Sequence, residues 1–422
     1  MTSRLHWLLL HLTRKLWFRA SLFSVIAVGT ALAGALASPY IPAELAAQLG
    51  ANAVGNILDI LGSSMLAVTI FSLSTMVSAY ASATSSATPR AIQLLLADTT
   101  SQNTLAIFIG SFVFSLAGLI ALSTGYYGEQ GRLALFVVSL AVTVVIVVAL
   151  LRWIDHVSRL GRVGDTTDRV EEAASAAMRS RRELPHLGGQ PLRDPGQDIP
   201  GDARTIRSRC IGYVQHIDMG ALQELAGSHH GQLFLCVLPG AFVDHSRALA
   251  HGLGMPANDK VDASVCKAFT IQDTRSFDQD PRFGASVLSE IASRALSPAI
   301  NDPGTAIDVI GRAVRLLSIW SEPVEPRAVD YPLVHVPGIA LIDLFDDLFT
   351  PIARDGAAVV EVGIRLQKGL RALVHLDGPR YAHAARHHSR LACERAMAVL
   401  RIEHDKALIR ALAEEIAGSP VA

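Results

Sequence analysis

Hydroxyl side chains are frequent in the apolar stretch from Asn56 to Arg90. In hydrocarbon a Ser or Thr hydroxyl can bond the backbone carbonyl one helical turn back, so single hydroxyls are tolerated. Hydroxyls in this number favour a contact with another helix, or a water-lined cavity, over a face in lipid. Close packing is the commoner use of such small residues, and a wetted pathway is the alternative.

A helical wheel predicts that several of these hydroxyls share one broad face. Asp59 lies near the outer end of the same stretch. An acidic group there can attract cations or lie at the headgroup level, which is the commoner case. The candidate pore-lining residues are Asp59, Ser64, Ser72, Thr75, Ser78, Ser82 and Ser86.

A second polar group lies between residues 272 and 305. Asp280-Pro281 and Asp302-Pro303 each predict a helix N-cap followed by proline at the first helical position. Helix N-termini can bind an anion, and an arginine can add a bidentate fork. The candidate ligand-binding residues are Arg275, Arg282, Ser297, Asn301, Asp302 and Thr305. A purely structural role is favoured, because capping at about 1 kcal/mol each explains both aspartates without a ligand.

Metal and catalytic motifs are weak or missing in the sequence. His383 and His387 are one turn apart on an expected helix, but H-E-x-x-H is missing and no third ligand follows at a fixed spacing. The G-x-S-x-G, P-loop and dinucleotide-binding fingerprints are also missing. We therefore expect no metal, no cofactor and no catalytic residue, and an enzyme is the least supported class of function.

The composition indicates a membrane protein with a large polar part. The 422 residues are 50% hydrophobic and only 18% charged, with a net charge of −1. That is too apolar for an ordinary soluble chain, and the charge implies no attraction to nucleic acid. The four cysteines show no C-x-x-C spacing, which favours reduced thiols over a disulfide framework.

Four apolar stretches predict four crossings of the bilayer, at about residues 18–38, 57–80, 105–125 and 133–151. Lys and Arg gather in the N-terminal tail, in the 81–104 loop and in residues 152–162, while the other loops carry only Arg132. By the positive-inside bias both termini are cytoplasmic. A cleaved signal peptide is the alternative for the first stretch, because Ala35-Leu36-Ala37 resembles a cleavage site.

The expected fold class is membrane α-helical, with four transmembrane helices and a cytoplasmic α-rich (α+β) domain that holds a small β-containing insert. Residues 1–154 form the transmembrane domain. Residues 155–203 are expected to form a connecting helix and a linker rich in Pro and Gly. Residues 204–279 form a small mixed region, and residues 280–422 a helical cytoplasmic domain. Residues 321–337 are expected to be irregular because they are rich in proline.

Three short strings carry a resemblance to a known family. They are Ala295-Leu-Ser-Pro-Ala-Ile-Asn-Asp-Pro-Gly-Thr-Ala306, Gly212-Tyr-Val-Gln215 and Pro239-Gly240. With the layout, they resemble an uncharacterised family of bacterial membrane proteins, domain of unknown function 2254. The family often has an acidic residue after the Pro-Gly, where this chain has Ala241. The resemblance implies a bacterial inner-membrane location and supplies no activity.

Two hypotheses on function follow. The first is a homo-oligomeric channel or transporter, in which the hydroxyl-rich helix lines the pathway and the cytoplasmic domain regulates or assembles it. Four crossings enclose little space in one copy, so a pathway needs several subunits around an axis. The alternative is a membrane-anchored sensor or scaffold that binds a cytoplasmic ligand or partner near Arg275–Thr305. The lipid bilayer and further copies of the chain are the expected partners.

Overall fold

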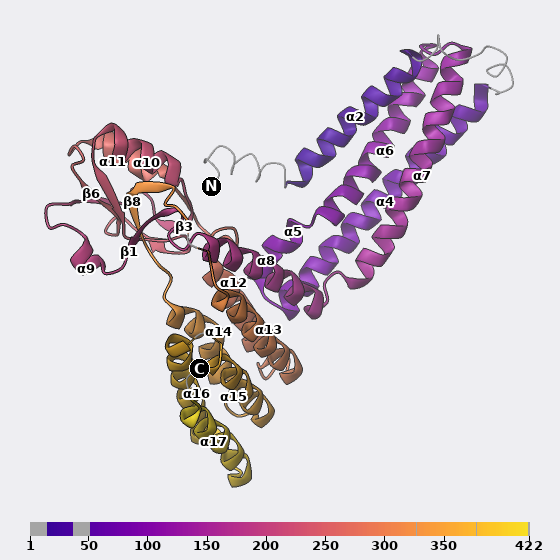
Figure 1. Ribbon diagram of the computed structural model, residues 1–422. Helices are drawn as coiled ribbons and strands as arrows, with labels where there is room; N and C mark the ends of the chain where they lie inside the picture. The colour runs from indigo at the N-terminus through magenta and orange to yellow at the C-terminus, as the bar shows by residue number, and fades with distance from the viewer. Residues whose placement is uncertain (1–14, 37–50, 326, 377, 421–422) are drawn as a thin grey trace. The chain divides into compact units, whose positions relative to one another are not determined.

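The computed structural model describes residues 15–36, 51–325, 327–376 and 378–420, which divide into two compact units. The apolar unit holds Ile92–Asp165 together with the described residues up to Ser85. The mixed unit holds Ser86–Ala91 and the described residues from Thr166 onward. The turn that follows the hydroxyl-rich helix therefore belongs to the mixed unit, although its neighbours in sequence do not. Figure 1 labels most of the elements of both units.

The apolar unit consists of four long helices, which lie side by side in Figure 1. They are α2 (Leu16–Leu36), α4 (Ala51–Ser86), α6 (Thr99–Ser123) and α7 (Glu129–Arg159), with the short η2 (Pro89–Ala91) and α5 (Ile92–Leu96) after α4. Within the described residues α4, α6 and α7 are long and apolar enough to cross a membrane, and α2 contributes a shorter apolar segment. The last two residues of the first expected crossing, 37 and 38, lie outside the described residues.

Small residues let these helices approach closely. A side chain at Gly118 of α6 would meet Leu58 of α4 at 3.0 Å, and one at Gly110 would meet Phe23 of α2 at 3.4 Å. The hydroxyl of Tyr127 donates to the carbonyl of Ala31. Such close backbone approach is how membrane helices associate without a hydrophobic driving force.

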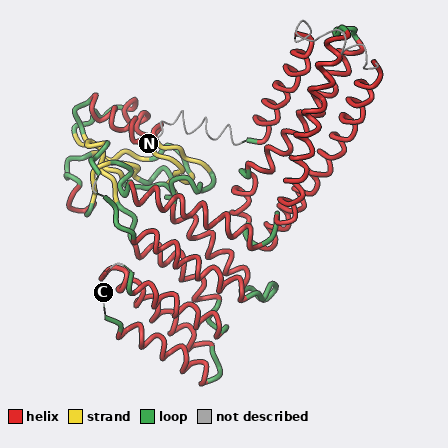
Figure 2. The backbone as a smooth tube through the Cα atoms, turned by 45° about the vertical axis from the view of Figure 1, so that its right-hand side comes forward, coloured by secondary structure: helices red, strands yellow, loops and turns green. Residues whose placement is uncertain are grey.

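The mixed unit contains two sheets, whose strands gather beside a stack of helices in Figure 2. The strands are β1 (Gly189–Leu192), β2 (Arg204–Arg207), β3 (Gly212–Ile217), β4 (Gln232–Leu235), β5 (Phe242–Val243), β6 (Ala248–Leu253), β7 (Phe269–Gln272) and β8 (Tyr331–Pro337). The larger sheet has the order β1-β8-β4-β6-β2 and the smaller β5-β3-β7. β8 pairs in parallel with β1 and β4, and the other pairs are antiparallel.

Two segments expected to be irregular each contribute a strand to the larger sheet. The 155–203 segment contains β1 and the helix α9 (Pro195–Asp198) after its connecting helix, so it is more than a linker. The proline-rich 321–337 segment contains β8, which lies between β1 and β4. Its prolines stand near the strand ends, while Val334 and Val336, on either side of His335, are fully buried. The β-containing region therefore extends beyond residues 204–279.

Helices complete the mixed unit. They are α8 (Val163–Glu183), α10 (Met219–Ser228), α11 (Asp259–Ala268), α12 (Pro281–Ala295), α13 (Pro303–Ser321), α14 (Leu341–Asp355), α15 (Val360–Val374), α16 (Gly378–Val399) and α17 (Glu403–Gly418). The two Asp-Pro predictions are confirmed, since Asp280 and Asp302 cap α12 and α13 with proline following. α8 packs directly on α12, because a side chain at Gly284 would overlap Ala174.

Candidate functional site

The hydroxyls of α4 are divided between a packed face and an exposed face. Ser72 is fully buried on the packed face, which also carries Met65 and Met76. Ser64 and Ser78 are exposed instead. The wheel therefore grouped residues that the structure separates, because at 100° per residue Ser72 falls about 80° from Ser64 and enters the contact with the neighbouring helices.

The remaining candidates on α4 differ in how their polar atoms are satisfied. Thr75 is half-buried and donates to the carbonyl of Phe71 at 2.9 Å, which satisfies it within the helix. Asp59 and Ser82 are exposed. The side chain of Ser86 lies outside the described residues.

The exposed surface of α4 has two distinct sides. One side carries large aliphatic residues: Leu66, Ile70, Leu73 and Val77. The other carries residues at spacings of three and four, which we call the small-residue stripe: Ser64, Ala67, Phe71, Ser74, Ser78, Ala81 and Ser85, all exposed. Within the described part of the chain, the hydroxyls of Ser64, Ser74 and Ser78 have no hydrogen-bond partner. This spacing is the one that a left-handed helix pair uses.

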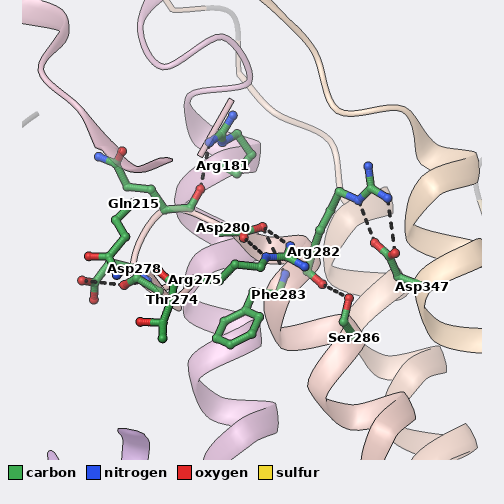
Figure 3. Close-up of polar contacts among 12 residues, drawn as sticks. Arg181, Gln215, Thr274, Arg275, Asp278, Asp280, Arg282, Phe283, Ser286 and Asp347 are labelled. Carbon is green, nitrogen blue, oxygen red and sulfur yellow. Dashed lines mark hydrogen bonds and ion pairs between the residues drawn. The ribbon is translucent and has the colours of Figure 1, made fainter. Parts of the chain in front are cut away.

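In the mixed unit, the candidate Arg275 is held by a buried carboxylate. Asp280 is 2% exposed and accepts from Arg275 twice, at 2.8 Å from Nε and 3.0 Å from Nη2. The same carboxylate caps α12 by accepting from the Phe283 backbone at 3.1 Å, and the guanidinium lies over the Phe283 ring (Figure 3). Burial raises the pKa of Asp280, while Arg275 opposes that rise. This bidentate pair occupies the fork that a ligand would need.

The candidate Arg282 is also paired within the chain. Its Nε donates to Asp347 at 2.7 Å (Figure 3). Its Nη1 donates to Asp343 at 2.6 Å, and both aspartates lie on α14. The pKa of Arg282 is raised by these carboxylates against the opposing effect of burial. Arg282 therefore ties α12 to α14. A cavity of about 270 Å³ lies beside this network, lined by Gly240, Arg275 and Asp343 among others.

The two shorter strings singled out in the sequence lie side by side, and the second of them reaches Asp280. Val214 donates to the carbonyl of Ala241 at 3.0 Å, and Gly240 donates to the carbonyl of Val214 at 2.8 Å. Gly240 has φ +97°, and a side chain there would overlap the carboxylate of Asp280. Glycine is therefore required twice at this position, for its backbone conformation and for the close approach.

The remaining candidates lie at the opposite end of α12. Ser297 donates to the carbonyl of Arg294 at 2.6 Å, and Asn301 has φ +50° in the turn before α13. Asp302 caps α13 by accepting from the backbone and hydroxyl of Thr305, which lowers the pKa of Asp302. The 15 residues of α12 separate this turn from Arg275 and Arg282 by about 22 Å. One small ligand cannot contact both groups.

Several charged residues of the mixed unit form ion pairs that the sequence did not predict. Arg312 is 8% exposed and donates to Asp168, Glu171 and Asp308 at 2.6–2.7 Å, which joins α8 to α13. Asp308 is four residues before Arg312, so an i,i+4 search finds that one contact. The contacts to α8 are long-range and carry no local signal.

The histidine pair singled out on α16 lies at a groove. His383 and His387 line a groove between α16 and α17. Within the described residues no group of three or more His, Cys, Asp and Glu side chains is placed to hold a metal ion.

Comparisons with known proteins place the chain among uncharacterised membrane proteins. The family model described as a predicted membrane protein, domain of unknown function 2254, matches residues 13–372. Uncharacterised proteins of Mycobacterium bovis and Mycobacterium tuberculosis are each 27% identical over 230 residues, which are 52% of this chain and 43% of each relative. The matched part of the chain thus spans less than half the length of these curated relatives. No solved structure matches.

The family model covers most of the chain, including the described apolar unit and the strings around Val214 and Gly240. The apolar helices α4, α6 and α7 agree with the family description. The chain therefore belongs to the predicted membrane proteins of the family domain of unknown function 2254.

Proposed function

We propose that the chain forms a homo-oligomeric channel or transporter in which α4 faces the axis of the assembly. The observation that carries this proposal is the set of exposed hydroxyls without a partner, Ser64, Ser74 and Ser78. A polar group without a partner is unfavourable in hydrocarbon, so these hydroxyls need either water or another subunit. Both are supplied when copies of α4 surround a central polar pathway.

The burial of the spanning helices supports the same arrangement. Only 17% of the most apolar part of α4 is buried within the chain, against 50% for α6 and 28% for α7. Yet α4 is the least apolar of the three. A helix surrounded by lipid is expected to be apolar all round, so the least apolar helix is expected to be the most covered. In the proposed assembly, contacts between subunits cover the exposed surface of α4, so that the least apolar helix is also well covered.

Phe71 is the only large residue of the small-residue stripe, and it is 71% exposed. Copies of Phe71 around an axis form an apolar ring between two polar segments. Such rings gate channels by excluding water. We place the gate of the pathway at Phe71.

The topology belongs to the same proposal. The distribution of Lys and Arg supports four crossings of a bacterial inner membrane, with α2 as the first and with both termini and the mixed unit in the cytoplasm. The ion pairs of Arg275 and Arg282 do not favour a ligand at these side chains, so the sensor alternative needs another site.

Disulfide trapping in native membranes tests the assembly. In a chain with its four cysteines replaced, Ser78→Cys and Ser74→Cys are expected to give covalent dimers on oxidation, because the stripe faces another subunit. Val77→Cys, on the aliphatic side, is the matched control and is expected to remain monomeric. Equal trapping at positions 77 and 78 would remove the basis of the proposal.

Flux of potassium and chloride from proteoliposomes tests the pathway. Phe71→Ala is expected to raise the flux, because it widens the ring, and Ser78→Leu is expected to lower it. Ile70→Leu, on the aliphatic side, should leave it unchanged. If dimers are trapped but none of these substitutions changes the flux, α4 mediates assembly without forming a conduit.

A further inference from the structure

The mixed unit contains an arginine-rich cavity away from the Arg275–Asp280 network. Its volume is about 580 Å³, and it lies between the end of α8, the end of α13 and the beginnings of α14 and α16. We call it the arginine cavity and define it by the residues used below: Arg181, Arg182, Trp320, Leu341 and Arg380. The volume is typical of small-molecule sites and larger than a bare ion needs.

Arg181 is the most unusual residue of this cavity. Its side chain is 3% exposed, and its Nη2 donates to the carbonyl of Gln279 at 2.9 Å (Figure 3). Its Nη1 is buried and has no hydrogen-bond partner in the described part of the chain. The carboxylate that acts on the pKa of Arg181 is that of Asp280, which already forms the bidentate pair with Arg275. One buried positive charge is thus left without a carboxylate of its own.

The environment of Arg181 makes this charge unfavourable as it stands. Burial lowers the pKa of Arg181 to about 10, with Asp280 acting in the opposite direction. Buried guanidinium groups in native proteins are normally paired and fully hydrogen-bonded. The arginine therefore needs an anion, and the cavity that it lines is where one can reach it.

Two further arginines line the same space. Arg182 donates from Nη1 to the carbonyl of Ile319 and to Glu322, while its buried Nε has no partner among the described residues. Arg380 is exposed and forms no ion pair within the described ranges. Three guanidinium groups against the single carboxylate of Glu322 leave a surplus of about two positive charges, with histidine counted as neutral.

The beginning of α14 adds backbone donors to this surplus. Its N-cap is Ala340, which has no side-chain acceptor, so no side chain caps the helix. Ala340 and Leu341 both line the cavity. An uncapped N-terminus of a 15-residue helix presents free N–H groups and a partial positive charge, which suit an oxyanion.

We propose that the arginine cavity binds a phosphate-bearing organic molecule, with the phosphate between Arg181, Arg380 and the beginning of α14. A phosphate carries a charge of about −1.5 to −2 at neutral pH, which matches the surplus, whereas a single carboxylate leaves a positive charge uncompensated. The remainder of the molecule fills the space beside Trp320. This site does not depend on α4 or on any flux.

Thermal unfolding of the full chain in detergent tests the site with inorganic phosphate, with AMP and with adenosine as the phosphate-free control. Phosphate and AMP are expected to raise the unfolding temperature, AMP at lower concentration, and adenosine is not. Micelles containing phosphatidylglycerol or only phosphatidylcholine distinguish a lipid headgroup from a soluble phosphate. A rise confined to phosphatidylglycerol assigns the cavity to a lipid and contradicts a soluble ligand. No rise with any of these probes overturns the proposal.

Two substitutions separate binding from a structural role. Arg181→Met without phosphate is expected to unfold at or above the wild-type temperature, because it removes an uncompensated buried charge, and it is expected to abolish the phosphate effect. Arg380→Ala removes an exposed group and is expected to weaken phosphate binding by about tenfold or more.

Arg354→Ala is the matched control, because it removes an arginine from the other end of α14, where Arg354 pairs with Asp355. It is expected to bind phosphate as the wild type does. If Arg181→Met fails to fold, Arg380→Ala decides the question alone. An unchanged phosphate effect in Arg380→Ala would exclude the cavity as the binding site.

Discussion

Two regions of the molecule concentrate polar residues, and they use them in opposite ways. On the small-residue stripe of α4 the hydroxyls of Ser64, Ser74 and Ser78 are exposed and have no partner in the described residues. At the beginning of α12, Asp280 and Arg275 are paired with each other and largely shielded from solvent. We call the first region incomplete, because its hydroxyls lack partners within one chain, and the second complete, because its charged groups are paired.

This difference bears on where function is expected. The presence of a polar group that is paired inside the chain is explained by its contribution to stability, because removing its partner leaves an unpaired buried charge. A polar group that is unsatisfied points to something outside the chain. By that measure the outward-facing hydroxyls of α4 and the spare nitrogen of Arg181 are better functional candidates than Arg275 or Arg282.

The largest expected effect tests the complete region, at Asp280 and Arg275. Asp280→Ala leaves the guanidinium of Arg275 in its half-buried position without a carboxylate and also removes the α12 cap. We expect the mixed unit to lose about 3–5 kcal/mol of unfolding free energy, measured by chemical denaturation of the full chain followed by a spectroscopic probe. A loss below about 1 kcal/mol would mean that Arg275 finds water or another partner, and that the region is less complete than its geometry indicates.

The next effect depends on pH and concerns His388, another buried polar residue of the mixed unit. It packs beside Phe345 and Phe349, with its Nε2 3.4 Å from Asp346. Burial lowers the pKa of His388 to about 4, helped by His387 and Arg395 and opposed by Asp346. The folded chain therefore keeps the ring neutral under conditions in which the unfolded chain protonates it.

The sign of the pH effect follows from this difference. Stability from the neutral ring is fully present above about pH 6.5 and is lost as the pH falls towards 4, by up to about 3 kcal/mol. Denaturation across this range should show a steeper loss for the wild type than for His388→Phe. Parallel pH profiles for the two proteins would show that the ring is solvated in the folded chain.

Much of the fold was predictable from local patterns, and the site was less so. The caps at Asp280 and Asp302 follow from two adjacent residues each, and the long apolar helices follow from composition. β8 was missed because its sheet partners β1 and β4 are far away in sequence and prolines stand near both of its ends. The pairing of Arg282 with Asp343 and Asp347 was missed for the same reason, since the partners lie on another helix.

The division of the α4 hydroxyls illustrates a second limit. A sequence gives the angle of each residue around a helix, but it does not give the direction in which the neighbouring helices lie. The structure shows the packed face, because Met65 and Met76 share a buried cluster with Leu105 and Phe108 of α6. Once that face is known, Ser72 belongs to it and Ser64 does not.

A smaller effect compares the two Asp-Pro caps directly. Asp302 has the same local sequence role as Asp280, but it is exposed and its partners are the backbone and hydroxyl of Thr305. Asp302→Ala is therefore expected to cost about 1 kcal/mol, the usual value for a cap. The same denaturation experiment measures it. Equal losses for Asp280→Ala and Asp302→Ala would show that the ion pair with Arg275 adds nothing beyond capping.

The smallest effect concerns the incomplete region and separates stability from assembly. Ser64→Ala and Ser78→Ala remove hydroxyls that have no hydrogen-bond partner in the described chain, so each is expected to change the stability of the monomer by less than about 0.5 kcal/mol. Ser72→Ala, at a buried position, is the internal comparison. Its hydroxyl has no partner among the described residues either, so losing it is expected to be neutral or slightly stabilising.

The size of the particle in detergent tests whether a second subunit covers the same hydroxyls. Ser78→Leu adds bulk where a second α4 is expected and should shift the particle in detergent to a smaller size, measured by light scattering, while Ser72→Ala leaves the size unchanged. A particle of one chain in the wild type would mean that lipid or detergent faces these hydroxyls directly. In that case the contrast between the two regions would reflect only the tolerance of membrane helices for serine, and α4 would not be a subunit interface.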